Sequence, residues 1–312
     1  MKRILFFASA AIVALASCAK TEVVYKDAPQ EIAFKQITGA MTKTTEALTS
    51  DMGVFAWTVT PHELYFGNTQ FELTDGVWKA DPSKFYPIQG ELDFAYYSPY
   101  AEDWTFNGST TLTSPDLDIK DTDVLYGTTI ATSPKTDAAL NVVLAHALAQ
   151  VTVNVTTDEE SKEYITIKDV TLSNTCLGGT LTVTYDDKDA SNAVWTADAA
   201  SSLIWDDEVV LDSTDPVLYG QNYIIADYGS GENYEQGTLT VSYSMDKDGA
   251  GAGTETYEGT ATFDLSTDGS KAYWNMGNNY IYNIKATLTE ITFDADVEEF
   301  VDTPTAGTPV VL

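Results

Sequence analysis

Cysteine and histidine are scarce in this chain of 312 residues, which has two of each. Because Cys18 belongs to the targeting segment described below, Cys176 is the one cysteine expected in the mature part, and a single cysteine cannot form an internal disulfide. We therefore expect packing to hold the fold, with Cys176 as a small buried apolar side chain. His62 follows a proline in a loop, and His146 lies in an apolar segment where a satisfied core histidine is the expected role. No serine or cysteine nucleophile motif accompanies either histidine, so the sequence predicts no catalytic residue and no enzyme.

Basic residues are also few, with 16 Lys and Arg against 47 Asp and Glu and a net charge of −31. Removal of a leader that contains Lys2 and Arg3 leaves 14 basic residues and a net charge of −33. Such a surface repels nucleic acid phosphates and anionic lipid heads, so no nucleic acid partner is expected. The acidic residues are spread through loops, and 44% hydrophobic residues can supply a core, which excludes a disordered chain.

Recognisable metal and cofactor motifs are lacking as well. Residues Asp246–Gly253 resemble a calcium loop, but the third acidic ligand and the spaced glutamate of an EF-hand are missing. This segment lies between two alternating segments, so a hairpin loop is expected, and Asp186–Asp189 is interpreted in the same way. Gly229–Gly231 indicates a turn rather than a nucleophile elbow. We expect no cofactor and no metal site, with incidental surface calcium left open.

The long apolar run Ile4–Ala16 follows the basic start Met1–Arg3 and is too short for a stop-transfer helix. Residues 1–17 are therefore expected to be a secretory signal peptide. The segment Leu15–Cys18 (LASC) is a lipobox, which predicts cleavage between Ser17 and Cys18 and a lipid on the Cys18 thiol. Residues 18–30 would be a polar tether, and the lipid would anchor the protein to the outer membrane at the cell surface. An ordinary signal peptide with an incidental cysteine is the alternative.

Short segments of alternating apolar and polar residues, separated by turn residues, fill most of the remaining chain. The clearest are Thr180–Tyr185, Thr238–Met245 and Tyr280–Leu288. Elements this short, with few helical patterns, predict antiparallel sheets packed as β-sandwiches. Further strands are expected at Glu31–Gln36, Gly53–Thr60, Leu64–Leu73, Gly76–Lys79, Glu91–Pro99, Thr110–Leu117, Val124–Ala131, Tyr164–Leu172, Val217–Ile225 and Glu255–Leu265.

The central stretch Asp123–Val155 is the seam of the predicted organisation. Its end, Val151–Val155, alternates as a half-buried strand does, whereas Leu140–Gln150 is apolar at both parities and also fits a short helix. The β-branched residues that follow favour a strand. We expect the seam to join two β-domains, residues 31–137 and residues 138–312.

Aromatic residues are dense in the first of these domains. Most are expected to be core side chains whose polar ends reach water, and a glycan-binding surface is the alternative. The residues concerned are Trp57, Tyr65, Trp78, Tyr86, Tyr96, Tyr97 and Trp104.

Three features in order along the chain resemble the fimbrillin family, the type V pilus subunits and related lipid-anchored surface proteins of Bacteroides-type Gram-negative bacteria. They are the lipobox, the run DVLYG at Asp123–Gly127 followed by VVLAHALAQVTVNV at Val142–Val155, and the segment Trp274–Phe300. The last is similar to the final long strand of the family. The resemblance implies an all-β protein with two tandem transthyretin-like β-sandwich domains.

The resemblance also implies assembly by donor-strand exchange, in which a protease removes the tether with the first strand and a neighbour's C-terminal strand fills the groove. The removable strand would contain Ile32, Phe34 and Gln36, and the cut would fall at Lys43 and Thr44. Many relatives are cut after arginine, but this chain has no arginine beyond Arg3, so the protease and the bond are open.

The C-terminal extension, residues 300–312, ends in Val310, Val311 and Leu312, the candidate donor strand. Docking of this tail on its own domain is the alternative. The expected partners are other copies of the chain or other fimbrial subunits, the outer membrane through the lipid on Cys18, and a host or bacterial surface ligand. Two functions stay open: a trimmed, polymerised pilin of a fimbria, or an uncleaved lipid-anchored pilus anchor or surface adhesin.

Overall fold

The computed structural model describes residues 29–36, 50–107, 110–119, 121–132, 139–185, 190–226, 237–246, 256–265 and 274–299. Every regular element in these ranges is a β-strand, which confirms the all-β class. The described residues include no helix that is long and apolar enough to cross a membrane. The strands are β1 (Ala33–Gln36), β2 (Met52–Thr58), β3 (Glu63–Thr74), β4 (Val77–Lys79), β5 (Leu92–Ser98), β6 (Thr105–Phe106), β7 (Thr111–Asp118), β8 (Leu125–Thr132), β9 (Leu140–Val142), β10 (Ala145–His146), β11 (Leu148–Thr156), β12 (Ile165–Thr175), β13 (Gly178–Tyr185), β14 (Ala190–Ala197), β15 (Ser201–Trp205), β16 (Val209–Val210), β17 (Val217–Ile225), β18 (Thr238–Asp246), β19 (Thr256–Asp264), β20 (Asn278–Ala286) and β21 (Ile291–Glu299).

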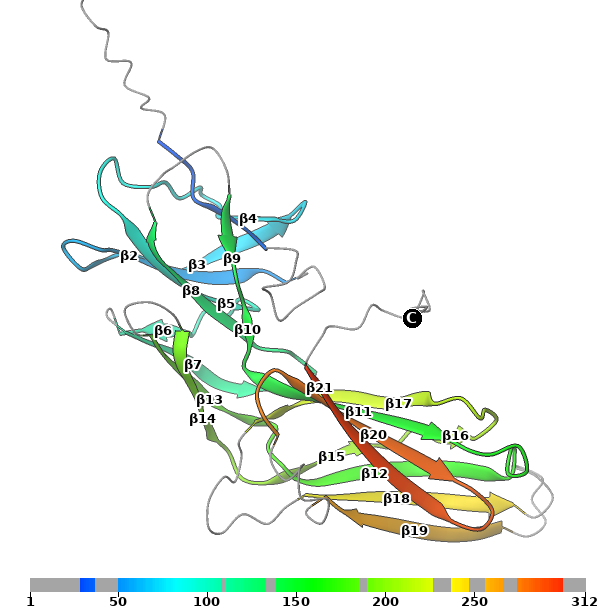
Figure 1. The fold of residues 1–312 in the computed structure, drawn as a ribbon. Coiled ribbons are helices and arrows are strands. Elements are labelled where there is room, and N and C mark those ends of the chain that lie inside the picture. Colours follow the sequence, from blue (N-terminus) through cyan, green and yellow to red (C-terminus); the bar gives the residue numbers. More distant parts are fainter. Residues whose placement is uncertain are drawn as a thin grey trace, which may run out of the picture.

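The N-terminal region is one eight-stranded sheet in the order β10-β8-β5-β2-β3-β4-β1-β9 (Figure 1). Long β3 pairs with β2 along most of its length and with β4 at its end, so the two parts of the sheet can face each other. The turn from β3 to β4 uses Asp75 and Gly76, whose φ angles of 52° and 75° suit the Asp-Gly pair of a tight hairpin. The apolar cluster that this sheet encloses is called the N-terminal core. Its buried residues are Ile32, Phe34, Met52, Val54, Ala56, Phe71, Trp78, Ala80, Leu92, Phe94, Tyr96, Leu125, Val142 and Leu144.

A four-stranded sheet, β14-β13-β7-β6, contributes to a second apolar cluster that also takes residues from β2 and β5. We call this cluster the middle core; among its residues are Phe55, Trp57, Tyr97, Leu112, Cys176, Leu181 and Ile225. Strands β7 and β13 are antiparallel partners although the predicted boundary at residues 137 and 138 lies between them. Likewise β9 pairs with β1 and β10 with β8. Strand pairing thus crosses the boundary, and the division into two tandem domains stays a prediction.

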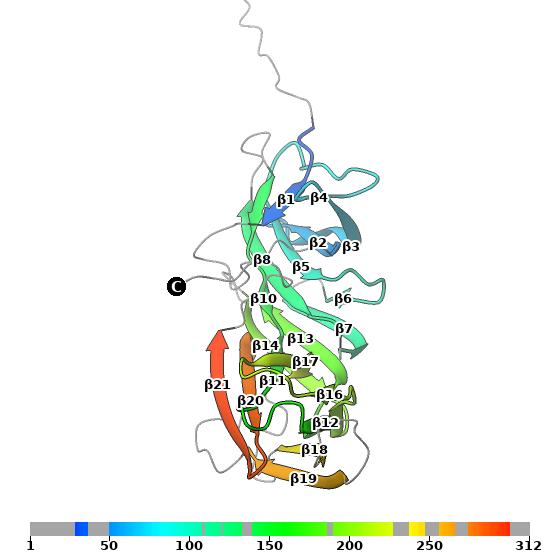
Figure 2. The same ribbon diagram turned by 90° about the vertical axis from the view of Figure 1, so that its right-hand side faces the viewer.

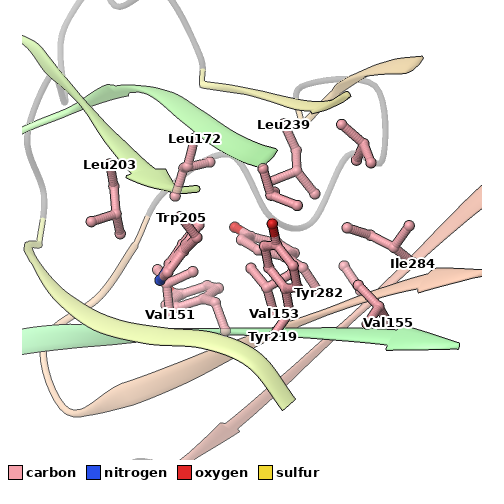
Figure 3. Packing of buried hydrophobic residues seen from close by; sticks show 14 of the residues in the cluster. Val151, Val153, Val155, Leu172, Leu203, Trp205, Tyr219, Leu239, Tyr282 and Ile284 are labelled. Atoms are coloured by element: carbon pink, nitrogen blue, oxygen red, sulfur yellow. The ribbon is translucent and has the colours of Figure 1, made fainter. Parts of the chain in front are cut away.

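The C-terminal region is a sandwich of the sheet β17-β11-β20-β21 on the sheet β15-β12-β18-β19. Alternation decides its inner face: Val151, Val153 and Val155 of β11 point inward with Leu172 and Leu239 of the facing sheet (Figure 3). We call this cluster the C-terminal core; it also includes Leu203, Trp205, Tyr219, Tyr280, Tyr282 and Ile284.

The central seam is extended, as predicted, and it passes through all three cores. Leu144 lies in the N-terminal core, Leu148 in the middle core and Val151 in the C-terminal core. Odd-numbered and even-numbered residues of the segment are both apolar because successive parts of it pack into different cores. The helical alternative for Leu140–Gln150 is therefore wrong.

The segment Trp274–Phe300 differs from the expected single long strand. It contains β20 and β21, which form a hairpin with nine cross-strand pairs. The turn is closed at Thr287, whose N–H donates to Glu290 O over 2.8 Å and whose Oγ1 accepts from Glu290 N–H over 3.1 Å. Alternation continues on both sides of this turn, so the pattern alone concealed the reversal. Alternation does not predict β14 and β15, because their alanine and serine residues weaken the apolar pattern.

Candidate functional site

Strand β1 lies in the interior of its sheet although it is the first described strand. It lies beside β4 (Figure 2) and is antiparallel to it, with Phe34 opposite Trp78. It is parallel to β9, with Phe34 opposite Leu140. Each side of β1 therefore has a hydrogen-bonded neighbour. Removing β1 would leave one edge of β4 and one edge of β9 without partners.

Two side chains of this segment, Ile32 and Phe34, are completely buried in the N-terminal core. The Phe34 ring centroid lies 5.1 Å from that of Phe71, 5.2 Å from that of Phe94 and 6.2 Å from that of Tyr96. Burial of each such side chain contributes about 1.5–3 kcal/mol. The space that β1 occupies is thus an apolar groove with aromatic walls, and we call it the β1 groove.

Polar contacts fix β1 at its N-terminal end. The N–H of Ile32 donates to Lys84 O over 2.7 Å. The carboxylate of Glu31 accepts from Ser83 Oγ over 2.6 Å and lies 3.1 Å from Lys79 Nζ. The hydrogen bond from Ser83 and then the contact with Lys79 lower the pKa of the Glu31 carboxyl, which is therefore ionised at neutral pH. These contacts set the register of β1, because each is made at one position along the strand.

The chain between β9 and β10 is held against β8 by Tyr96. Its hydroxyl lies 3.0 Å from Thr128 O and 3.2 Å from Val143 O, and burial raises the pKa of Tyr96 to about 12, so it remains a neutral donor. A Cβ added at Gly127 would lie 2.3 Å from Val143 O. The glycine of the DVLYG run therefore permits this close approach.

Other residues of the central motif connect the start of β8 with β10 and the residue that follows it. His146 is buried, and its Nδ1 lies 2.6 Å from Asp123 Oδ2. The N–H of Ala147 donates to Val124 O over 2.8 Å. His146 is thus a core histidine whose Nδ1 contacts a carboxylate, and the motif residues fasten the seam to the start of β8.

A fimbrillin-like family model matches residues 38–299. The chain belongs to the fimbrillin-like family. The matched part begins after β1 and ends at the last residue of β21.

Solved structures share the fold of this fimbrillin-like chain at low sequence identity. A fimbrial protein from Bacteroides vulgatus is 15% identical, with a TM-score of 0.55 over 87% of this chain and 99% of that one. A candidate cell adhesion protein from Bacteroides uniformis is 16% identical, with a TM-score of 0.54 over 86% and 99%. The comparison with curated proteins yields no match.

Of the residues predicted to take part in assembly, the structure brings Ile32, Phe34 and Gln36 together on and just before β1. The others lie outside the described residues, so their roles stay predictions. They are Ser17 and Cys18 of the lipidation site, Lys43 and Thr44 of the cut site, Val310, Val311 and Leu312 of the tail, and the loops 186–189, 229–231 and 247–255.

The dense aromatic residues of the fimbrillin-like chain are mostly buried, as expected for core side chains. Trp57, Trp78, Tyr96, Tyr97 and Trp104 are each less than 5% exposed, whereas Tyr65 is 41% exposed. Cys176 is fully buried, as predicted. Within the described ranges, His, Cys, Asp and Glu side chains form no group of three suited to a metal ion.

Two features of the β1 groove are not predicted from the sequence. One is the contact of Glu31 with Ser83 and Lys79, which lie about fifty positions away and carry no motif. The other is β9 as a partner of β1, because short Leu140–Val142 is part of a longer apolar run. Neither can be found from periodicity, since both depend on long-range pairing.

Proposed function

We propose that this fimbrillin-like chain is a structural subunit of a surface fimbria that polymerises by donor-strand exchange and supports adhesion. Its precursor would carry a lipid on Cys18 at the outer membrane and would lose the segment before Thr44 by proteolysis. The family supports a fimbrial subunit at the cell surface. The observation that carries the exchange step is β1, a terminal strand that is buried between two partners.

The physical basis is the groove that trimming would leave. A cut in residues 37–49 separates β1 from β2 in sequence, so β1 would then be held by non-covalent contacts alone. Its departure would expose Phe71, Phe94 and Trp78 to water and leave β4 and β9 with unpaired backbone groups. An extended segment from another subunit reverses both costs, and this provides the driving force for assembly.

A second function, an uncleaved anchor or surface adhesin of the same fold, is favoured by the contacts at the entrance of the groove. The hydrogen bonds at Ile32 and Glu31 add to the pairing of β1 with β4 and β9 and oppose its release. An anchor would retain β1 and the lipid on Cys18, and its ligand would be a host or bacterial surface molecule.

The test is the intact mass and N-terminal sequence of protein sheared from the surface of its native cells. A start at or near Thr44 without lipid is expected for a polymerising subunit, together with ladders on unboiled gels. A lipid-blocked start at Cys18 as the sole species would instead establish the anchor or adhesin.

A further inference from the structure

Apolar side chains that meet solvent gather at the loop between β4 and β5. Ile88 is 95% exposed, more than any other large apolar side chain that the structure describes, and Phe85 is 40% exposed. Tyr65 of β3 is 41% exposed and adjoins this loop, because its hydroxyl donates to Phe85 O over 2.9 Å. We call Tyr65, Phe85 and Ile88 the loop patch. Exposed apolar side chains that are grouped in this way mark a surface for a partner or a membrane.

The loop that carries the patch differs in charge from the chain as a whole. Between Asp81 and Glu91 it contains Lys84 and no acidic residue, in a chain with 47 acidic and 16 basic residues. The Lys84 ammonium lies 5.8 Å from the centroid of the Phe66 ring, which is 5.9 Å from that of Tyr65. The repulsion that an acidic surface exerts on lipid head groups is therefore relieved beside the patch.

The loop patch is joined to the residues that follow the predicted lipid tether. The N–H of Tyr86 donates to Gln30 O over 2.9 Å, and Phe85 forms an antiparallel bridge with Glu31. The chain advances twelve residues from Cys18 to Gln30, and an extended chain spans at most about 43 Å over that length. A lipid on Cys18 would thus keep the loop patch close to the membrane surface.

Other exposed apolar side chains lie elsewhere in the molecule. The β4–β5 loop and the chain that enters β1 share one end of the molecule, and the C-terminal sandwich forms the other end (Figure 1). Ile204, Val210 and Leu218 are exposed on β15, β16 and β17 of that sandwich. An anchor at Cys18 would therefore bring the loop patch to the lipid and leave these side chains at a distance.

We propose that the loop patch is a membrane-contact surface that enters the bilayer interface when Cys18 carries its lipid. The inference rests on the proposed function for that lipid and adds a second point of attachment. Both candidate functions include this stage, since the precursor and the anchor each carry the lipid.

The chemistry of the three side chains suits the two depths of a bilayer interface. Ile88 and Phe85 would leave water for the boundary of the acyl chains, where the gain grows with the apolar area that is buried. Tyr65 would stay among the head groups, where a ring with a polar end is favoured. Attachment at two points fixes a direction, so the C-terminal sandwich would be held away from the membrane.

The experiment uses the mature chain from Cys18, coupled through that thiol to a maleimide phospholipid in vesicles of zwitterionic phosphatidylcholine. Cys176 is completely buried, and burial raises the pKa of its thiol, so the coupling is directed to Cys18. Amide hydrogen exchange compares this form with the same chain coupled to a water-soluble maleimide. Ile88→Ser is the test variant. Ile204→Ser, which changes an isoleucine that is 52% exposed on β15, is the matched control.

A second measurement reports entry into the acyl chains directly. Ile88→Trp and Ile204→Trp are coupled to vesicles with and without brominated phosphatidylcholine, whose bromine atoms quench a tryptophan that reaches them. The parent chain, coupled in the same way, gives the quenching of its own tryptophans. The two variants carry the same new side chain, so a difference between them reports position.

We expect vesicles to slow exchange in residues 82–90 about tenfold in the parent and in Ile204→Ser, and much less in Ile88→Ser. Brominated lipid should quench Ile88→Trp more than the parent, and Ile204→Trp no more than the parent. Unchanged exchange and no added quenching in the coupled protein would overturn the proposal. So would a dimer of the uncoupled parent that Ile88→Ser dissociates, because the loop patch would then contact a second copy.

The coupling supplies the anchor chemically, so these outcomes do not depend on lipidation in the native cell. Absence of lipid on Cys18 in the native protein would remove the proposed precursor and anchor while exchange on vesicles still slowed. Failure of the loop patch to enter the vesicles would leave the lipid and the fimbrial role as proposed. The two failures are therefore distinguishable.

Discussion

The N-terminal and C-terminal cores are both closed by packed strands, but they differ in how the closing strand is supplied. The N-terminal core needs β1, which precedes the family match and is joined to β2 by residues 37–51. Among the residues that the structure describes, the buried members of the C-terminal core run from Ala149 to Ala295, and none comes from β1–β8. Loss of the N-terminal segment should therefore open one core and leave the other intact.

The two cores also differ in composition. Around β1 the walls are mainly aromatic, with Phe71, Phe94, Tyr96 and Trp78, whereas β11 supplies a row of valines to the C-terminal core. A few large rings concentrate the stabilisation on a short strand, because each buries more apolar area than a valine. A strand of four residues therefore closes the N-terminal core mainly through Phe34 and its aromatic neighbours.

The largest expected effect comes from Phe34→Ala. The change deletes a fully buried ring among three aromatic neighbours, and substitutions of this kind cost about 3–5 kcal/mol of unfolding free energy. Amide hydrogen exchange should rise in β1, β4 and β9 and stay unchanged in β18 and β20. Equal loss of protection in both cores would show that they unfold as one unit and would remove the distinction between them.

The converse change is Gly220→Ala in β17. An added Cβ would lie 2.1 Å from Trp205 Cδ1, so the indole must move and the C-terminal core is overpacked at a cost of about 1–3 kcal/mol. Loss of protection should be confined to β15, β17 and β11. Gly67→Ala is the control, since nothing lies within 4 Å of its added Cβ. A larger effect on β1 than on β17 would contradict the independence of the two cores.

Asp123→Asn tests the connection between the regions. It replaces the charge-assisted contact with His146 Nδ1 by a neutral one, at a cost of about 1 kcal/mol. Because the contact fastens the seam between the N-terminal and middle cores, exchange should rise in β8 and β10 together. Thr122→Asn, at an exposed neighbouring position, should have no such effect. If Asp123→Asn changes neither strand, the contact does not couple them.

The local pattern of apolar and polar residues predicts the positions of most strands of this chain, but it does not predict how they pair. Alternation predicted Val217–Ile225 to its ends, and Asp75-Gly76 marked the β3–β4 hairpin. The reversal at Thr287–Glu290 was hidden because its turn carries no glycine or proline. The pairing of β1 with β9 was hidden because parallel partners so far apart are chosen by the fold as a whole. The groove could be suspected from the resemblance, but its walls could not be listed from periodicity.

The smallest expected effect comes from Glu31→Gln, which separates the contribution of the polar contacts of β1 from that of its apolar burial. The contact with Lys79 is largely exposed to solvent, so the change should lower stability by at most about 1 kcal/mol. Because the pKa of Glu31 is lowered in the folded chain, its contribution is complete at neutral pH and is lost as the pH falls through that lowered pKa. After a cut in residues 37–49, release of the β1 fragment from the parent should therefore accelerate below that pH, while release from Glu31→Gln starts faster and lacks this step. Glu298→Gln, on the exposed face of β21, is the control. A step of equal size in Glu31→Gln would assign the acid sensitivity to other carboxylates, and the Glu31 contacts would then add nothing to the backbone pairing and apolar burial that hold β1.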